Sequence, residues 1–124
     1  MSEHNLVVLR GTLAGDPRTR ELPSGSAVTQ FDVTTRDDGG TQSVPVAWFD
    51  APAAGRDLAA GTEVIVVGSV RRRFFKAGGA TQSRTEVVAE RIVAARRGRE
   101  VRRLLGSACL LLDPASAEAG AELG

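Results

Sequence analysis

Five β-prone segments, separated by turns that contain Gly or Pro, follow one another along the chain and limit the folds it can adopt. We expect strands at residues 5–14, 27–35, 44–50, 63–75 and 81–92, with a short polar extension at 18–22. Asp50 offers an N-cap and Pro52 a first-turn proline, so a short helix is expected over 53–60, between the third and fourth strands. This order is that of the OB-fold, an all-β, five-stranded Greek-key barrel.

Glycines mark the bends and turns of the expected barrel. Gly11 interrupts the first apolar segment and suggests a bend within that strand. The hairpin turns are expected at Asp38-Gly39-Gly40 and Ala77-Gly78-Gly79, because glycine supplies the positive φ angles that tight turns need. The shorter turns Gly15-Asp16-Pro17 and Pro23-Ser24-Gly25 would flank the polar extension.

The 124 residues are enough for one compact domain with its own core. We divide the chain into a barrel at residues 1–94 and a basic helical segment with a flexible tail at 95–124. Residues 94–112 lack proline and carry apolar side chains at helical spacing, which predicts an amphipathic helix. Its apolar residues are Val101, Leu104, Leu105 and Ala108.

Residues suited to catalysis are too few for most enzyme sites. Cys109 is the only cysteine and His4 the only histidine, so the sequence offers no disulfide framework, no zinc quartet and no Cys/His or Ser/His/Asp set to assemble. Asp37 and Asp38 lie in a Gly-rich turn, where solvated charge is commoner than a general acid–base pair. We expect no enzymatic activity, metal, cofactor or small-molecule substrate.

Apolar stretches and the start of the sequence bear on localisation. The apolar runs are far shorter than the roughly 20 residues of a membrane span. Residues 1–5 also lack the basic and then apolar order of a signal peptide. We therefore expect a soluble cytoplasmic protein without a membrane partner.

Cationic charge is unevenly distributed, although the net charge is only +1. Residues 1–90 carry ten basic and eleven acidic side chains, whereas 91–112 carry six arginines and the single acid Glu100. Lys76 is the only lysine among sixteen cationic side chains, so nearly every contact to phosphate can use the planar fork of a guanidinium group.

Three segments combine strands, bends and turns in a recognisable order: NLVVLRGTLAGDPRTRELPSGSAVTQFDVTT (5–35), GTEVIVVGSVRRRFF (61–75) and RTEVVAERI (84–92). In order and spacing they resemble the bacterial single-stranded DNA-binding protein family. The resemblance implies an OB-fold that coats single-stranded DNA in replication, repair or recombination, without catalysis and associated with the nucleoid. It also implies a homodimer or homotetramer.

The resemblance points to two aromatic side chains and a set of arginines as the DNA-binding residues. Phe49 and Phe75 fall where the family places stacking rings, and stacking on a ring contributes roughly 1–3 kcal/mol per base. Arg71 and Arg73 alternate with Phe75, so the three share one face of a strand and the arginines would hold phosphates. The further candidates along the same groove are Arg10, Arg18, Arg20, Arg36 and Arg84.

The remaining aromatic residues are expected elsewhere. Phe31 is expected in the core. Trp48 precedes Phe49 and must point to the opposite face, which makes it a core residue or a subunit contact. Arg72 and Phe74 point away from the face that carries Arg71 and Phe75.

Several positions depart from the family pattern. Gly39 and Ser43 stand where the family has tryptophans, so two stacking platforms are missing. Asp37 and Asp38 place negative charge on the loop that would embrace DNA, unless Arg36 offsets it. The last six residues contain neither Phe nor Pro, so the resemblance implies a short paralogue without the acidic recruiting tip.

Two alternatives follow from the sequence. The basic segment 96–103 could extend the DNA path, or the face formed by Val101, Leu104 and Leu105 could seal a subunit interface. The rival function is an OB-fold module for protein interaction or replisome assembly that has little DNA affinity, motivated by the missing tryptophans and the near-neutral barrel.

Overall fold

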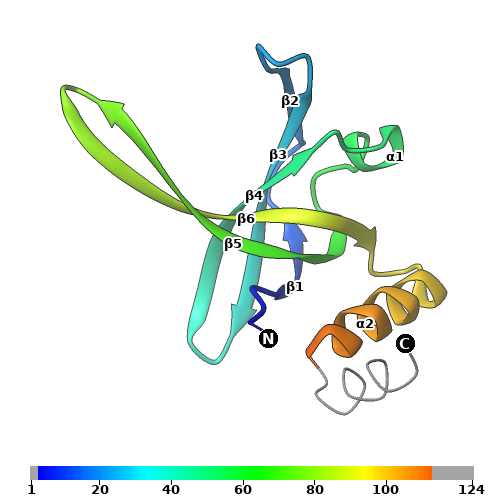
Figure 1. Cartoon of the computed structure of the whole chain (residues 1–124). Helices are drawn as coiled ribbons and strands as arrows, with labels where there is room; N and C mark the ends of the chain where they lie inside the picture. Colours follow the sequence, from blue (N-terminus) through cyan, green and yellow to red (C-terminus); the bar gives the residue numbers. More distant parts are fainter. Residues whose placement is uncertain (1–2, 113–124) are drawn as a thin grey trace, which may run out of the picture.

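A computed structural model of the chain describes residues 3–112, in which six strands and two helices are found (Figure 1). In chain order they are β1 (Val7–Leu13), β2 (Arg18–Glu21), β3 (Ala27–Asp37), β4 (Gly40–Phe49), α1 (Ala53–Arg56), β5 (Glu63–Ala77), β6 (Ala80–Ala94) and α2 (Gly98–Leu112). Neither helix of this part of the chain has the length and apolar character needed to cross a bilayer.

The long strands close into a barrel. The sheet order is β1-β5-β6-β4-β3-β2, and β1 also pairs with β3 through Thr12 opposite Thr34 and Leu13 opposite Val33. The pairing of β4 with β6 is parallel, whereas the other pairings are antiparallel. Five strands thus form the barrel, with α1 between the third and fourth of them, and the OB-fold prediction is confirmed.

Gly11 permits the strand contact that closes the barrel. A Cβ atom at this position would lie 2.4 Å from the Thr34 carbonyl oxygen and 2.8 Å from a methyl carbon of Val33. The bend predicted at Gly11 therefore coincides with a close approach of β1 to β3, which a larger residue would obstruct.

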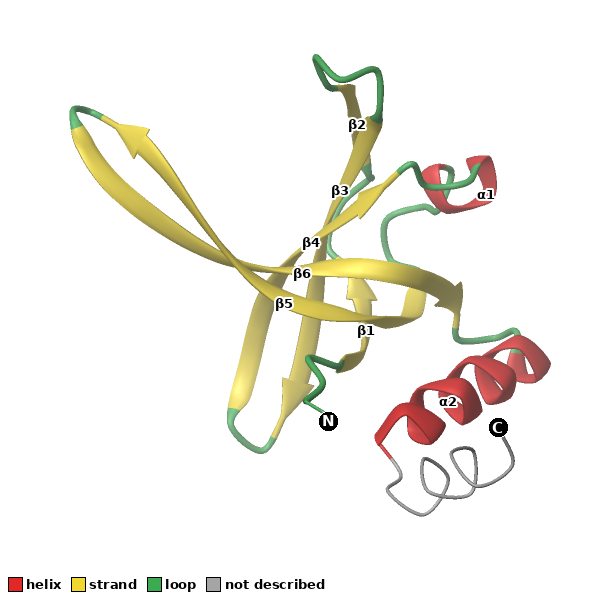
Figure 2. Ribbon diagram, viewed as in Figure 1, coloured by secondary structure: helices red, strands yellow, loops and turns green. Residues whose placement is uncertain are grey.

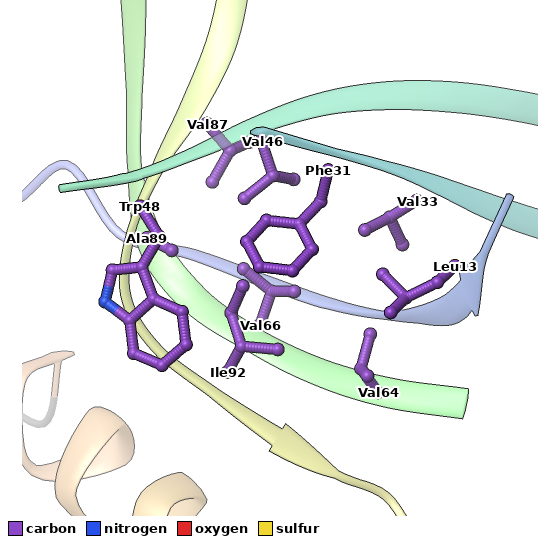
Figure 3. Close-up of a cluster of buried hydrophobic side chains, with 10 residues drawn as sticks. All are labelled: Leu13, Phe31, Val33, Val46, Trp48, Val64, Val66, Val87, Ala89 and Ile92. Atoms are coloured by element: carbon purple, nitrogen blue, oxygen red, sulfur yellow. The ribbon is translucent and has the colours of Figure 1, made fainter. Parts of the chain in front are cut away.

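The barrel interior is filled by apolar side chains from all five long strands (Figure 3). Phe31 and Trp48 lie in this cluster with their ring centroids 6.4 Å apart, so both are core residues. The cluster consists of Leu13, Phe31, Val33, Val46, Trp48, Val64, Val66, Val87, Ala89 and Ile92.

A second apolar cluster joins α2 to the outside of the barrel. Alternation along β5 turns Ile65 and Val67 away from the interior, and both pack in one cluster with Leu104 of α2. The other buried members are Val93 and Ala108, with Leu6, Ala95, Val101 and Leu105 partly buried against them. Leu104 and Ala108 of α2 therefore pack against the outside of the barrel within the chain.

The structure corrects several element boundaries. The polar extension is a sixth strand, β2, which pairs with β3 along four residues. The helix expected over 53–60 ends at Arg56, and Asp50 does not cap it. Asp50 instead has φ 51°, and its carboxylate accepts a hydrogen bond from the Ala27 N–H at 3.0 Å.

Other differences concern the hairpins and the C-terminal helix. Of the turn Asp38-Gly39-Gly40 only Gly40 has a positive φ, and β4 begins there instead of at Val44. β6 runs on to Ala94, so α2 starts at Gly98. The expected flexible tail and the absent acidic tip lie in residues 113–124, outside the described part of the chain.

Candidate nucleic-acid interface

The β5–β6 hairpin projects beyond the barrel as a two-stranded ribbon (Figure 2). β1 pairs with β5 only as far as Gly68, and β4 pairs with β6 only at Val87 and Val88. Residues 71–86 therefore pair only with one another, in a ribbon about 23 Å long at about 3.3 Å per residue. Asn5 ties the root of the ribbon to the N-terminal segment, because its side-chain amide exchanges hydrogen bonds of 2.7 and 2.9 Å with the Val70 backbone.

The alternation of β5 and β6 gives the ribbon two faces. Val64 and Val66 point into the barrel, so the odd-numbered residues of β5 continue the outside of the barrel. A β-bulge at Glu90 leaves this residue without a paired residue on β5. On both sides of the bulge, each pair of facing residues on β5 and β6 points to the same side of the sheet. We call the resulting surface the outer face: Arg71, Arg73 and Phe75 on β5, opposite Glu86, Arg84 and Gln82 on β6.

Phe49 lies on the same outer side because its neighbour Trp48 fills the core. The Phe49 ring is partly exposed, and the guanidinium carbon of Arg71 lies 5.3 Å from its centroid, within the range of a cation–π contact. An aromatic ring from β4 and an arginine from β5 are therefore side by side on one surface.

A buried carboxylate lies between the two ribbon arginines at the barrel end. Glu86 is only 4% exposed and accepts a hydrogen bond of 3.1 Å from Arg71. The Nε of Arg73 lies 3.8 Å from the same oxygen, too far for a hydrogen bond, and no other partner is found for it among residues 3–112. Glu86 thus offsets one of the two positive charges and brings both arginines to one place.

The β2 arginines extend this surface across the barrel. Arg20 is paired with Val28 of β3, and Val28 is paired with Phe49, so the three lie in a row across neighbouring strands. Arg18 lies 4.0 Å from the Asp32 carboxylate, an exposed pair that contributes little stability. Alternation puts Arg36 on the same face of β3, near the tip of the β3–β4 hairpin.

Arg10 is placed apart from the other candidates. It lies opposite Ile65, on the side of the barrel that α2 covers, and its side chain forms an ion pair with Glu63. A hollow of about 600 Å³ beside it is lined also by Gly61 and Arg96. Strand pairing and alternation therefore place Phe49, Phe75, Arg18, Arg20, Arg36, Arg71, Arg73 and Arg84 on one surface, but not Arg10.

A comparison with known families finds a match over most of the chain. Residues 4–95 match the model of the Single-strand binding protein family. The chain belongs to that family. The match includes every strand and α1 and ends before α2. Members of the Single-strand binding protein family bind single-stranded DNA and are not enzymes, so this general function extends to the present chain. No cluster of three or more His, Cys, Asp or Glu suited to a metal ion is found among residues 3–112.

The hollow near the start of α2 is less favourable to phosphate groups than the ribbon is. A hollow of about 790 Å³ opens beside Phe49 and reaches the segment before α2. Its charged lining consists of Arg91, Arg96 and Arg97 together with Asp50, Asp57, Glu90 and Glu100. The four carboxylates outnumber the three arginines, so phosphate groups are less favoured in this hollow than along the ribbon.

The structure explains the acidic turn and adds one residue that the sequence did not indicate. Asp37 accepts a hydrogen bond of 2.8 Å from the Gly39 N–H, so it shapes the β3–β4 turn. Glu86 was not a candidate, although it touches both Arg71 and Arg73. The signal that could have found it is its position directly opposite Arg71 in a regular hairpin register.

Replacing Glu86 with Gln is expected to tighten oligo(dT) binding at low salt. The amide keeps an oxygen that can accept the Arg71 hydrogen bond but removes the negative charge next to two guanidinium groups. The slope of log affinity against log salt should steepen by about 0.7, the value for one additional phosphate contact on a single strand. Fluorescence anisotropy across a salt series measures it, and weaker binding by the variant at all salt concentrations would contradict the prediction.

Proposed function

We propose that the protein binds single-stranded DNA along the outer surface that runs from β2, over Phe49, to Phe75 near the tip of the ribbon. The observation that carries the proposal is the exposed Phe49 ring with Arg71 beside it, because a ring suited to stacking and a cation suited to phosphate then lie side by side. The Single-strand binding family match supports the same class of ligand.

The proposed binding mode combines stacking with charge. Phe49 and Phe75 present ring surface to bases, and such stacking tolerates any base sequence. The guanidinium groups of Arg20, Arg71 and Arg84 lie on the same face and would contact phosphates along the strand. This arrangement predicts sequence-independent binding whose affinity falls with salt.

We further propose a cellular role as a coating or accessory protein in DNA replication, repair or recombination, in the cytoplasm and at the nucleoid. The sequence resemblance described above supports this role and also supports assembly into a homodimer or homotetramer. Because α2 covers Ile65, Val67 and Val93, subunits would have to meet through other parts of the barrel.

A titration of fluorescent oligo(dT) at several salt concentrations tests the proposed function. Three to four phosphate contacts on the outer surface predict a salt slope of about 2 to 3, at roughly 0.7 per contact. Arg84→Gln should lower the slope by about 0.7, whereas Arg10→Gln, on the α2 side, should leave it unchanged.

The absence of binding at the lowest salt concentration, with a folded protein, would reject DNA binding. The OB-fold interaction module would then be the better description. An equal loss of slope in Arg10→Gln and Arg84→Gln would show instead that the strand also crosses the α2 side.

A further inference from the structure

We propose that the opposite face of the ribbon is a second contact surface for single-stranded DNA, so that the hairpin is held by nucleic acid on both sides. We call it the inner face: Val70, Arg72, Phe74 and Lys76 on β5, opposite Val87, Thr85, Ser83 and Thr81 on β6. The inference rests on the proposed function and adds Phe74, Arg72 and Lys76 to the binding residues.

The inner face continues the interior of the barrel, and its side chains become exposed from the root of the ribbon onward. Val87 still belongs to the barrel core, but Val70 opposite it is already 45% exposed. Beyond this pair no third strand covers the ribbon in the described part of the chain, and Phe74 is 66% exposed, against 39% for Phe75. The inner face therefore presents more free ring surface than the outer face does.

The charge of the inner face also suits a polyanion. Residues 70–85 contain five cationic side chains and no carboxylate. On the outer face Glu86 offsets part of the charge of Arg71 and Arg73. Arg72 and Lys76 lie on the inner face opposite Thr85 and Thr81, which are uncharged.

The geometry of the hairpin lets one strand reach both faces. Phe74 and Phe75 are consecutive in β5, so their rings lie at the same height on opposite sides of the ribbon. At this height no other strand of residues 3–112 pairs with the second edge of β5, because β1 ends its pairing at Gly68 and Asn5 hydrogen-bonds to Val70 at the root of the ribbon. A nucleic-acid strand that bends round this free edge can stack a base on each ring.

Charge decides between DNA and a second protein surface as the occupant. An apolar partner would have to bury Arg72 and Lys76 next to Phe74, and desolvating these charges without partners is costly. Phosphates supply the missing partners, and exposed bases supply flat groups for the ring. The inner face therefore fits single-stranded DNA better than an apolar protein surface.

A tryptophan reporter added to one face at a time tests the proposal in the full-length protein. In Phe74→Trp and Phe75→Trp the added indole lies on an exposed ribbon, whereas the native Trp48 is buried and gives a constant background. Saturating oligo(dT) at low salt should quench the added emission in both variants. Phe74→Ala should weaken oligo(dT) binding about tenfold.

A matched pair of charge variants provides an independent measurement. Arg72→Gln should lower the salt slope by about 0.7, whereas Arg56→Gln on α1 should not change it. Both arginines are exposed, so neither change should affect folding.

The outcomes separate the second face from the function itself. Quenching of Phe75→Trp alone, with normal affinity in Phe74→Ala, would overturn the second face and leave DNA binding intact. Emission of Phe74→Trp that changes with protein concentration in the absence of DNA would assign the face to a second copy and also overturn the proposal. Failure of every variant and of the wild type to bind would reject the proposed function.

Discussion

Phe49→Ala is expected to weaken binding of oligo(dT) by about 5- to 150-fold at every salt concentration, the range that corresponds to roughly 1–3 kcal/mol for one stacked base. The ring lies on the exposed outer side of β4 and has Arg71 5.3 Å from its centroid. The substitution removes no charge, so the salt slope should stay that of the wild type. Anisotropy titrations at three salt concentrations measure both quantities.

The control for Phe49→Ala is Val8→Ala. Val8 is also an exposed apolar residue of a barrel strand, but it lies on β1 opposite Val67, which packs against α2. The Val8→Ala substitution should leave the affinity for oligo(dT) unchanged. A loss that disappears at high salt would mean that Phe49 acts only by orienting Arg71, and an unchanged affinity would show that the strand does not cross β4.

Gly11→Ala is expected to destabilise the protein by about 3 kcal/mol, at the upper end of the usual cost of overpacking. The new methyl group would meet the Thr34 carbonyl oxygen at 2.4 Å, and this atom belongs to the strand pairing that closes the barrel. Backbone atoms cannot move aside without loss of the pairing of β1 with β3. Chemical denaturation followed by circular dichroism measures the free energy of unfolding.

Gly15→Ala is the matched control for the barrel closure. A Cβ at Gly15 would have no neighbour within 4 Å, and its φ is not positive, so the change should be almost neutral. Similar stabilities of the two variants would show that β1 can shift away from β3 and that the close approach at Gly11 does not limit the fold.

The order of the barrel strands was predictable because it depends on local signals. Gly78 and Gly79 both adopt the positive φ that a tight hairpin needs, and the β-branched run from Val64 to Val67 is a strand as expected. The polar β2 was missed as a strand because all four of its residues are exposed, so its sequence carries no apolar alternation. Only its pairing with β3 makes it a strand.

The end of α1 depends on a tertiary contact that local sequence does not encode. Gly55 is buried, and a Cβ there would lie 2.3 Å from the Trp48 ring. The segment after β4 is thus shaped by its packing on the indole, and its alanine content did not indicate how short the helix is.

The candidate site was predictable in part. Alternation along one strand was enough to group Arg71, Arg73 and Phe75. The role of Glu86 requires the register between β5 and β6, and the separation of Arg10 requires knowledge of which side of the barrel α2 covers. The exposure of Phe74 was also not predictable from the sequence. Alternation usually indicates that one face of a strand is covered, whereas both Phe74 and Phe75 of the ribbon are exposed.

The packing of α2 decides where this domain can be divided. Family similarity stops at residue 95, but Leu104 and Ala108 are buried with Ile65, Val67 and Val93 of the strands. A fragment trimmed to the similar region would present that strip of valine and isoleucine to water and would lose solubility. We therefore expect α2 and the barrel to unfold in a single cooperative transition. Biophysical experiments should use a protein that contains both the barrel and α2.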